Sequence, residues 1–102
     1  MGKISGKFYS WNEGNAKGIA AKSGVYGLYN NARVLIYIGS SSNLRERFTH
    51  YWNTNFDEDQ CKKATKMYKR EFTENYQARE RELLQQHQRE HGKLPDCNDV
   101  IP

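Results

Sequence analysis

Two runs of β-forming residues, 24–29 and 34–39, stand on either side of the polar connection Asn30-Asn31-Ala32-Arg33. Valine, isoleucine and tyrosine favour strands, whereas asparagine favours turns. The pattern predicts a β-hairpin closed by a four-residue loop. In that register Tyr26 lies directly across from Tyr37, and both phenols share one face of the sheet.

The apolar spacing changes from a strand period to a helical period after the second run. Leu44, Phe48 and Tyr51 recur three or four residues apart, which predicts an amphipathic helix. Asn43 is a typical N-cap, and Glu46 three residues later predicts a capping box.

The rest of the chain adds one strand and one longer helix. Residues 57–63 are expected to form a loop or a short helical turn, and residues 65–72 alternate well enough for a third strand. A helix over residues 74–91 should end at Gly92 and Pro95. The predicted order is β-β-α-β-α.

Residues 1–22 are expected to form a lead-in to this core, with a short helix after Asn12. Its apolar anchors are expected to be Phe8, Trp11 and Ile19. We treat residues 1–102 as a single domain, because no linker or repeat divides the chain.

Composition narrows the class of protein. The chain has 102 residues, a mean hydropathy of -1.01 and 13% aromatic residues, which suits one compact domain and argues against disorder. No run approaches the length of about 18 apolar residues that a membrane helix needs. Residues 1–8 lack the apolar stretch of a signal peptide, so we expect a cytoplasmic protein. Cys61 and Cys97 stand alone in the sequence, which favours two unpaired thiols over a disulfide or a metal site.

The charge is positive and unevenly distributed. The net charge is +4 with a pI near 9.1, and residues 62–70 carry five cations and no acid. From Glu71 onward acids outnumber cations. A polyanionic partner would suit this pattern, although taken alone it favours ordinary uneven surface charge.

Cations and phenols gather around the predicted hairpin and the helix after it. Arg47, His50 and Tyr51 are spaced i, i+3 and i+4, which places them on one polar stripe opposite the side of Leu44 and Phe48 that packs. Each residue alone is better explained as an ordinary strand tyrosine or a solvated cation. The arrangement, however, predicts a phosphate site.

The helix start adds to this prediction. Residues 40–43 form a Ser-Ser-Ser-Asn cluster ahead of the helix. We expect free backbone N–H groups there to face a phosphate.

Three motifs follow one another at fixed spacing: Gly24-Val25-Tyr26, Tyr37-Ile38-Gly39, and Ser-x-x-x-Leu-x-x-Arg ending at Arg47. As an ordered set over residues 23–98 they resemble the GIY-YIG nucleases. The resemblance implies an α+β fold of order β-β-α-β-α, in which helices flank a small three-stranded antiparallel sheet.

The resemblance also implies hydrolysis of phosphodiester bonds with one divalent metal ion, Mg²⁺ or Mn²⁺. In that family the two motif tyrosines, here Tyr26 and Tyr37, contact the attacking water or the scissile phosphate. Arg47 would neutralise the phosphate as its charge builds. Tyr51 occupies the place four residues after the arginine where the family carries His or Tyr. Ser40 stands where some members have Lys.

The family places its metal-binding glutamate on the last long helix, where this chain offers Glu80 and Glu82. At 100° per residue Glu80 falls within the apolar side of the helix, while Glu82 points away. Leu83 and Leu84 follow Glu80 at +3 and +4, as in the family. We therefore assign the metal to Glu80, and to Asn98 the family's bracing asparagine.

The leading functional prediction is a metal-dependent DNA endonuclease, and the alternative is a catalytically inactive nucleic-acid-binding module of the same fold. The complete Tyr, Tyr, Arg, Glu set favours the enzyme. The sequence does not separate DNA from RNA, and specificity would come from loops, a homodimer or a separate targeting protein. The residues expected to contact nucleic acid are Ser40, Arg45, His50, Lys62, Lys63, Lys66, Lys69, Arg70 and Asn98.

Overall fold

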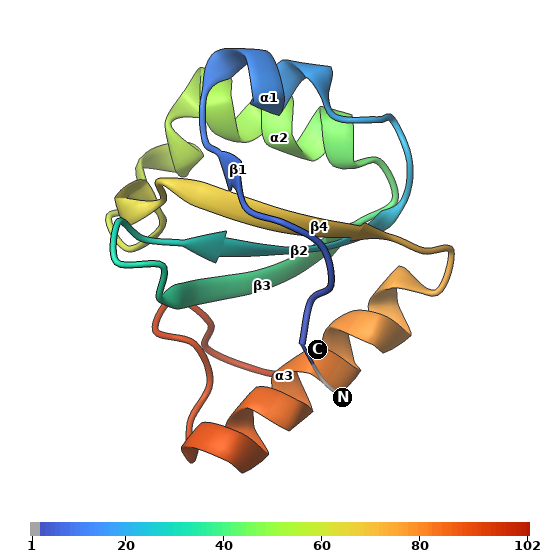
Figure 1. Ribbon diagram of the computed structural model, residues 1–102, viewed down its shortest axis with the longest axis vertical. Coiled ribbons are helices and arrows are strands. Elements are labelled where there is room, and N and C mark those ends of the chain that lie inside the picture. The colour runs from blue at the N-terminus through green and yellow to red at the C-terminus, as the bar shows by residue number, and fades with distance from the viewer. Residues whose placement is uncertain (1–2) are drawn as a thin grey trace.

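The computed structural model describes residues 3–102 and has an α+β fold (Figure 1). Its antiparallel sheet consists of β1 (Tyr9–Ser10), β2 (Gly24–Tyr29), β3 (Leu35–Ser41) and β4 (Met67–Phe72), in the order β1-β4-β2-β3. The helices are α1 (Glu13–Gly18), α2 (Leu44–Thr54) and α3 (Tyr76–His91). Two 3₁₀ turns, η1 (Phe56–Glu58) and η2 (Lys62–Ala64), lie between α2 and β4. The order β-β-α-β-α is confirmed from β2 onward.

Helices cover both faces of the sheet, with α1 and α2 on one face and α3 on the other (Figure 1). Successive strand residues point to opposite faces, so each face buries its own apolar cluster. Tyr26, Phe48 and Tyr51 belong to the cluster under α2, whereas Val25 and Leu84 belong to the cluster under α3. Among residues 3–102, no helix is both long enough and apolar enough to cross a bilayer.

The sheet has four strands rather than the three that we predicted. The extra strand, β1, contains only two residues, and it pairs Tyr9 with Tyr68 and Ser10 with Met67. Two residues are too few to show the alternation of apolar and polar side chains by which a strand is predicted from sequence. The strand is held instead by tertiary contacts, including the stacking of the Tyr9 and Tyr68 rings at 5.4 Å.

The lead-in otherwise follows the prediction. Asn12 caps α1 by accepting the Asn15 N–H at 2.8 Å, and Ile19 is buried. Trp11 packs edge-on against Phe48 with ring centroids 5.4 Å apart. The lead-in thus closes the apolar cluster beneath α2.

The predicted hairpin forms, but its register differs from the prediction. Tyr26 lies across from Gly39, and Tyr37 lies across from Leu28. The loop is one residue longer than expected, since Tyr29 pairs with Leu35, and an irregularity after Leu28 shifts the pairing by one more residue. A shift of one residue would reverse the faces, whereas the total shift of two preserves them. The two phenols therefore share a face, as predicted, but stand diagonally.

The start of α2 is capped more fully than expected. Asn43 Oδ1 accepts the Glu46 N–H at 3.1 Å, while the Asn43 N–H binds Ser41 Oγ at 3.1 Å. That second bond takes the place of the return contact expected from the Glu46 side chain. The Leu44 N–H binds the Lys22 carbonyl at 2.9 Å. The N–H groups of Leu44 and Glu46 at this helix end are therefore already bonded, which corrects the prediction of free N–H groups for these two residues.

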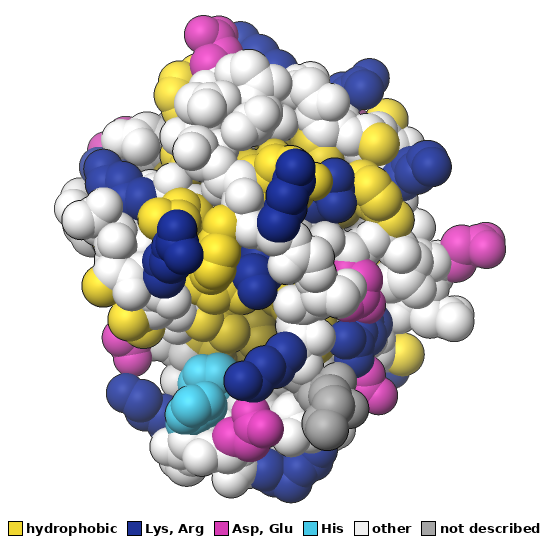
Figure 2. Space-filling model, viewed as in Figure 1, with side chains coloured by type: hydrophobic (Ala, Val, Ile, Leu, Met, Phe, Trp, Pro, Cys, Tyr) yellow, Lys and Arg dark blue, Asp and Glu magenta, His cyan; other side chains and the backbone are white. Residues whose placement is uncertain are grey.

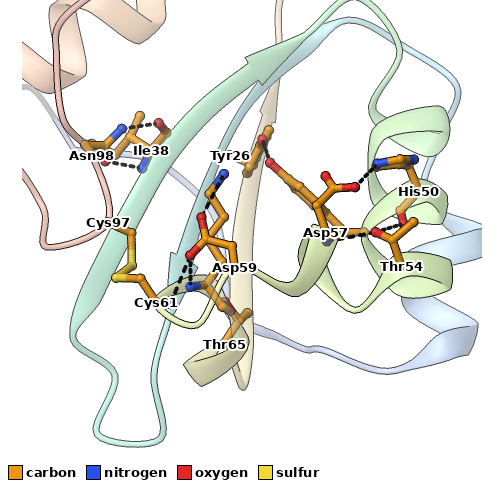
Figure 3. A network of polar contacts seen from close by, with 12 residues as sticks. Tyr26, Ile38, His50, Thr54, Asp57, Asp59, Cys61, Thr65, Cys97 and Asn98 are labelled. Carbon is orange, nitrogen blue, oxygen red and sulfur yellow. Dashed lines mark hydrogen bonds and ion pairs between the residues drawn. A yellow bond between two sulfur atoms is a disulfide. The ribbon is translucent and has the colours of Figure 1, made fainter.

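Cys61 and Cys97 form a disulfide, which corrects the prediction of two unpaired thiols (Figure 3). Their separation of 36 positions along the chain gives no sign in the sequence that they lie close together. The fold brings the turn before β4 next to the segment after α3, because the Cys97 N–H binds the Ile36 carbonyl of β3 at 2.8 Å. No local spacing signals this pairing.

Candidate active site

Tyr26 lies in the middle of β2 and is completely buried. Its ring packs edge-on against Phe48 with centroids 5.2 Å apart, and its hydroxyl shares a 2.7 Å hydrogen bond with the hydroxyl of Tyr51 on α2. Burial, followed by the proximity of Tyr51 and Tyr37, raises the pKa of the Tyr26 phenol well above its ordinary value. Tyr26 is therefore a neutral phenol at physiological pH.

Tyr37 on β3 is the more accessible of the two motif phenols. It is half-buried, and its ring centroid lies 6.1 Å from that of Tyr26. Burial raises the pKa of Tyr37 to about 12, Tyr51 and Glu80 add to this rise, and Arg47 opposes it. Arg47 acts to lower the pKa of Tyr37, but burial outweighs it.

Gly39 makes room for the Tyr26 phenol. The two residues face each other across β2 and β3, and a Cβ atom on Gly39 would lie 2.5 Å from both Cζ and the hydroxyl oxygen of Tyr26. A real side chain at this position would push the ring away. The glycine of the second motif is thus explained by the position of the first tyrosine.

If this site performs the cleavage that the sequence predicts, Gly39→Ala should reduce the cleavage rate at least about tenfold, because small displacements of reacting groups are costly. Overpacking should also destabilise the fold by about 1–3 kcal/mol. Gly18→Ala is the matched control, since nothing lies within 4 Å of a Cβ atom added there. Single-turnover rates and thermal melts of both variants test this explanation, which fails if Gly39→Ala is as active as Gly18→Ala.

Arg47 lies on the exposed side of α2, next to the phenols of Tyr26 and Tyr51. Partial burial opposes its charge, but the two phenols more than compensate and raise the pKa of the guanidinium. Tyr51 is 3% exposed and packs in the same cluster as Phe48. The predicted polar stripe is therefore wrong for Tyr51, whose hydroxyl reaches the site from inside the core.

His50 does not join the site. Its Nε2 pairs with Asp57 Oδ1 at 2.7 Å on the exposed end of α2 (Figure 3). His50 lies on the exposed side of α2, as its spacing from Arg47 predicts, but its side chain binds Asp57 in the turn after the helix.

Glu80 and Glu82 are separated as the helical phase predicts. Ser40 Oγ donates a 2.7 Å hydrogen bond to Glu80 Oε1, which connects α3 to the end of the strand that carries Tyr37. Glu82 instead pairs with Arg79, whose guanidinium also binds Glu71 at 2.7 Å. Only Glu80 stands close enough to influence the pKa of Tyr37.

Within residues 3–102, no three His, Cys, Asp or Glu side chains come together as a metal cage. Mg²⁺ usually keeps several water ligands and takes one or two carboxylates together with substrate phosphates. A single carboxylate at Glu80, which like Arg47 lies close enough to Tyr37 to influence its pKa, fits a metal of that kind.

Asn98 braces the strand that carries Tyr37. Its side-chain carbonyl accepts the Ile38 N–H at 2.9 Å, and its amide donates to the Ile38 carbonyl at 3.0 Å (Figure 3). Because both groups are used, the amide is engaged by backbone rather than presented to nucleic acid.

The predicted nucleic-acid cations are only partly brought together. Lys62 lies at the site, with Nζ 4.1 Å from the Tyr37 ring centroid. Lys63 forms an ion pair with Glu58, and Lys66 lies in the same loop. On α2, the Arg45 Nε–H donates to the Ile19 carbonyl at 2.8 Å. On β4, the Arg70 guanidinium binds the Tyr9 hydroxyl, and Lys69 stands over the Phe8 ring.

Asp59 is a site residue that the sequence analysis missed. Its carboxylate accepts the Lys62 N–H and contributes to the raised pKa of Tyr37.

A cavity of about 400 Å³ lies on the α3 side of the sheet, and the residues that line it include Leu35, Leu83, Lys69 and His87. Figure 2 shows an apolar hollow with basic and histidine side chains beside it. None of the five predicted catalytic residues, Tyr26, Tyr37, Arg47, Tyr51 and Glu80, lines it. The phenol cluster lies at the edge strand β3, where groups of α2 and α3 both approach Tyr37.

Comparison with known proteins agrees with this arrangement of motif residues. The profile of the UvrC-like GIY-YIG domain matches residues 22–89, more than half of the chain. The chain belongs to the GIY-YIG family. No curated protein matches it. The GIY-YIG match covers both motif tyrosines, Arg47 and Glu80, but ends before Cys97 and Asn98.

Proposed function

We propose that this GIY-YIG domain is a divalent-metal-dependent endonuclease that hydrolyses phosphodiester bonds in nucleic acid, with DNA as the expected substrate. The observation that carries the proposal is the placement of Arg47 and Glu80 around one cluster of phenols. A cation for the phosphate and a carboxylate for a metal are the two groups that this hydrolysis requires.

The residues would act as follows. Arg47 binds a nonbridging oxygen of the scissile phosphate and stabilises the charge that develops there. Tyr37, the accessible phenol, orients the attacking water. Tyr26 and Tyr51 are hydrogen-bonded through their hydroxyls and hold Tyr37 and Arg47 in position from the buried side of the site. Glu80 would hold one Mg²⁺ or Mn²⁺ ion, which when bound supplies Lewis-acid stabilisation of the phosphate.

The reaction balances with water as the only co-reactant. The water oxygen bonds to phosphorus, one phosphorus–oxygen ester bond breaks, and the leaving oxygen takes up a proton. The proton lost by water must go to a base, and the phenolate form of Tyr37 is the candidate closest to the surface.

The cleavage rate should therefore depend on pH. Because the pKa of Tyr37 is raised to about 12, the phenolate is scarce at neutral pH and becomes more populated as pH rises. We expect the single-turnover rate to increase from neutral pH upward by as much as about tenfold per pH unit. Tyr37→Phe should be slow and show a flatter profile. An equally steep profile in Tyr37→Phe would assign the proton transfer to another group.

A catalytically inactive binding module is the second candidate, and one observation favours it. The hydroxyls of Tyr26 and Tyr51 satisfy each other, and Glu80 already accepts the Ser40 hydroxyl. Such a site could bind phosphate without turnover. Incubating duplex, single-stranded, nicked and branched DNA, and the corresponding RNAs, with and without Mg²⁺ or Mn²⁺ separates the two functions.

The proposal also extends to the source of substrate specificity and to the cellular location. A homodimer or a separate targeting protein would supply specificity, since the matched domain accounts for most of the chain. The expected cytoplasmic location stays a proposal, and the Cys61–Cys97 disulfide weighs against it, because such bonds persist mainly in oxidising compartments.

A further inference from the structure

Lys62 occupies an unusual place for a lysine, because its ammonium lies over the site phenols. Nζ is 4.1 Å from the Tyr37 ring centroid and 5.6 Å from that of Tyr51. Its side chain is only 17% exposed. Cations over aromatic faces are stabilised by the ring quadrupole, and more strongly when water is partly excluded.

The turn that carries Lys62 is fixed by local hydrogen bonds. Asp59 Oδ1 accepts the N–H groups of Cys61 at 2.9 Å and of Lys62 at 3.2 Å. Thr65 Oγ1 donates to the Lys62 carbonyl at 2.7 Å. These hydrogen bonds fix the backbone conformation of η2 without any contribution from a bound ligand.

The same turn is bonded covalently to the segment that follows α3. Cys61, adjacent to Lys62, forms the disulfide with Cys97, and Asn98, the residue after Cys97, is hydrogen-bonded to both backbone groups of Ile38 (Figure 3). The turn that carries the lysine is therefore connected to the strand of Tyr37 through one disulfide and the hydrogen bonds of the segment beyond it.

The charge of Lys62 is only partly balanced within residues 3–102. Among the described residues its acidic partner is Asp59, whose Oδ2 lies 4.0 Å from Nζ in a long ion pair. Arg47 approaches Tyr51 and Tyr26, while Lys62 approaches Tyr51 and Tyr37. Two cations therefore border the three phenols, and this arrangement attracts an anion.

We propose that Lys62 is a second phosphate-contacting catalytic residue of this nuclease, acting beside Arg47, and that the Cys61–Cys97 disulfide is what positions it. The inference rests on the proposed function and extends it. The competing explanation is that the contact between Lys62 and the Tyr37 ring only stabilises the turn and that the ammonium does not bind phosphate.

Lys63 provides the matched control. It is the next residue of the same turn, and its charge is balanced by Glu58 at 2.5 Å. A loss of general positive charge affects Lys62→Ala and Lys63→Ala alike, whereas a loss of the phosphate contact affects only the first.

The test compares single-turnover cleavage of a labelled DNA at saturating protein and fixed metal concentration. We expect Lys62→Ala to be slower by about ten- to a hundredfold, Lys62→Arg to recover most of the rate, and Lys63→Ala to lose distinctly less than Lys62→Ala. The Cys61→Ser/Cys97→Ser variant should lie between wild type and Lys62→Ala. Thermal melts identify any variant whose loss comes from unfolding. Equal rates for Lys62→Ala and Lys63→Ala in folded proteins would overturn the proposal.

A binding measurement separates this inference from the proposed nuclease activity. Without metal, Lys62→Ala should bind the same DNA with a salt slope smaller by about 0.9 than wild type, while Lys63→Ala should change the slope less. If wild type binds but does not cleave, the nuclease proposal fails, and a reduced slope in Lys62→Ala still supports the phosphate contact. An unchanged slope overturns that contact whether or not wild type cleaves.

Discussion

Glu80→Gln is expected to abolish both Mn²⁺ binding and cleavage, whereas Glu82→Gln should leave both near wild type. Glutamine keeps the size and helix propensity of glutamate, and its carbonyl can still accept the Ser40 hydroxyl, so the fold should survive. The change removes the negative charge that a hard dication needs. The expected loss of rate is on the order of a hundredfold or more.

Calorimetric titration of Mn²⁺ into each variant, alongside a cleavage assay, measures this difference. Glu82 is the matched control because it lies on the same helix and pairs with Arg79 away from the phenols. If Glu82→Gln were inactive and Glu80→Gln active, the metal assignment would move by two residues. If neither mattered, the binding-module alternative would take the place of the nuclease.

Arg47→Ala is expected to lower the single-turnover cleavage rate by about a hundred- to a thousandfold while leaving most of the binding affinity intact. The guanidinium contributes chiefly when the phosphate becomes more anionic than in the ground state. Because Arg47 lies at an exposed position, we expect little change in thermal stability.

Arg89→Ala is the control for this variant, since Arg89 is exposed in the last turn of α3 and binds only Gln86 among the described side chains. Rates and affinities measured at one salt concentration separate chemistry from general electrostatics. Wild-type rates in Arg47→Ala would mean that the residue is an ordinary surface cation of α2.

Local patterns predicted the elements of this fold well. The strand runs, the Asn43 cap and the helix ending at Gly92 depend on residues close together in sequence, and each appears where its pattern placed it. The helical phase also placed Glu80 and Glu82 on different sides of α3.

Features fixed by distant contacts were missed or placed wrongly. The hairpin register depends on how many residues the loop actually uses, and β1 exists only because β4 pairs with it. The Cys61–Cys97 bond joins segments that only the complete fold brings together. The spacing of Tyr51 from Arg47 predicted a place on a polar stripe, yet its ring packs in the core and only its hydroxyl enters the site, since a phenol is amphipathic.

The phenol cluster is proposed to perform metal-dependent hydrolysis, and a cleavage assay of wild type and two variants, with and without metal, tests this proposal. Wild type, Arg47→Ala and Glu80→Gln are each incubated with the panel of labelled DNA and RNA substrates, with Mg²⁺, with Mn²⁺ or with a chelator. The account predicts that wild type cleaves at least one substrate only when metal is present, and that both variants fail to cleave it. Binding without cleavage by wild type under every condition, or metal-independent cleavage that persists in both variants, would contradict the account.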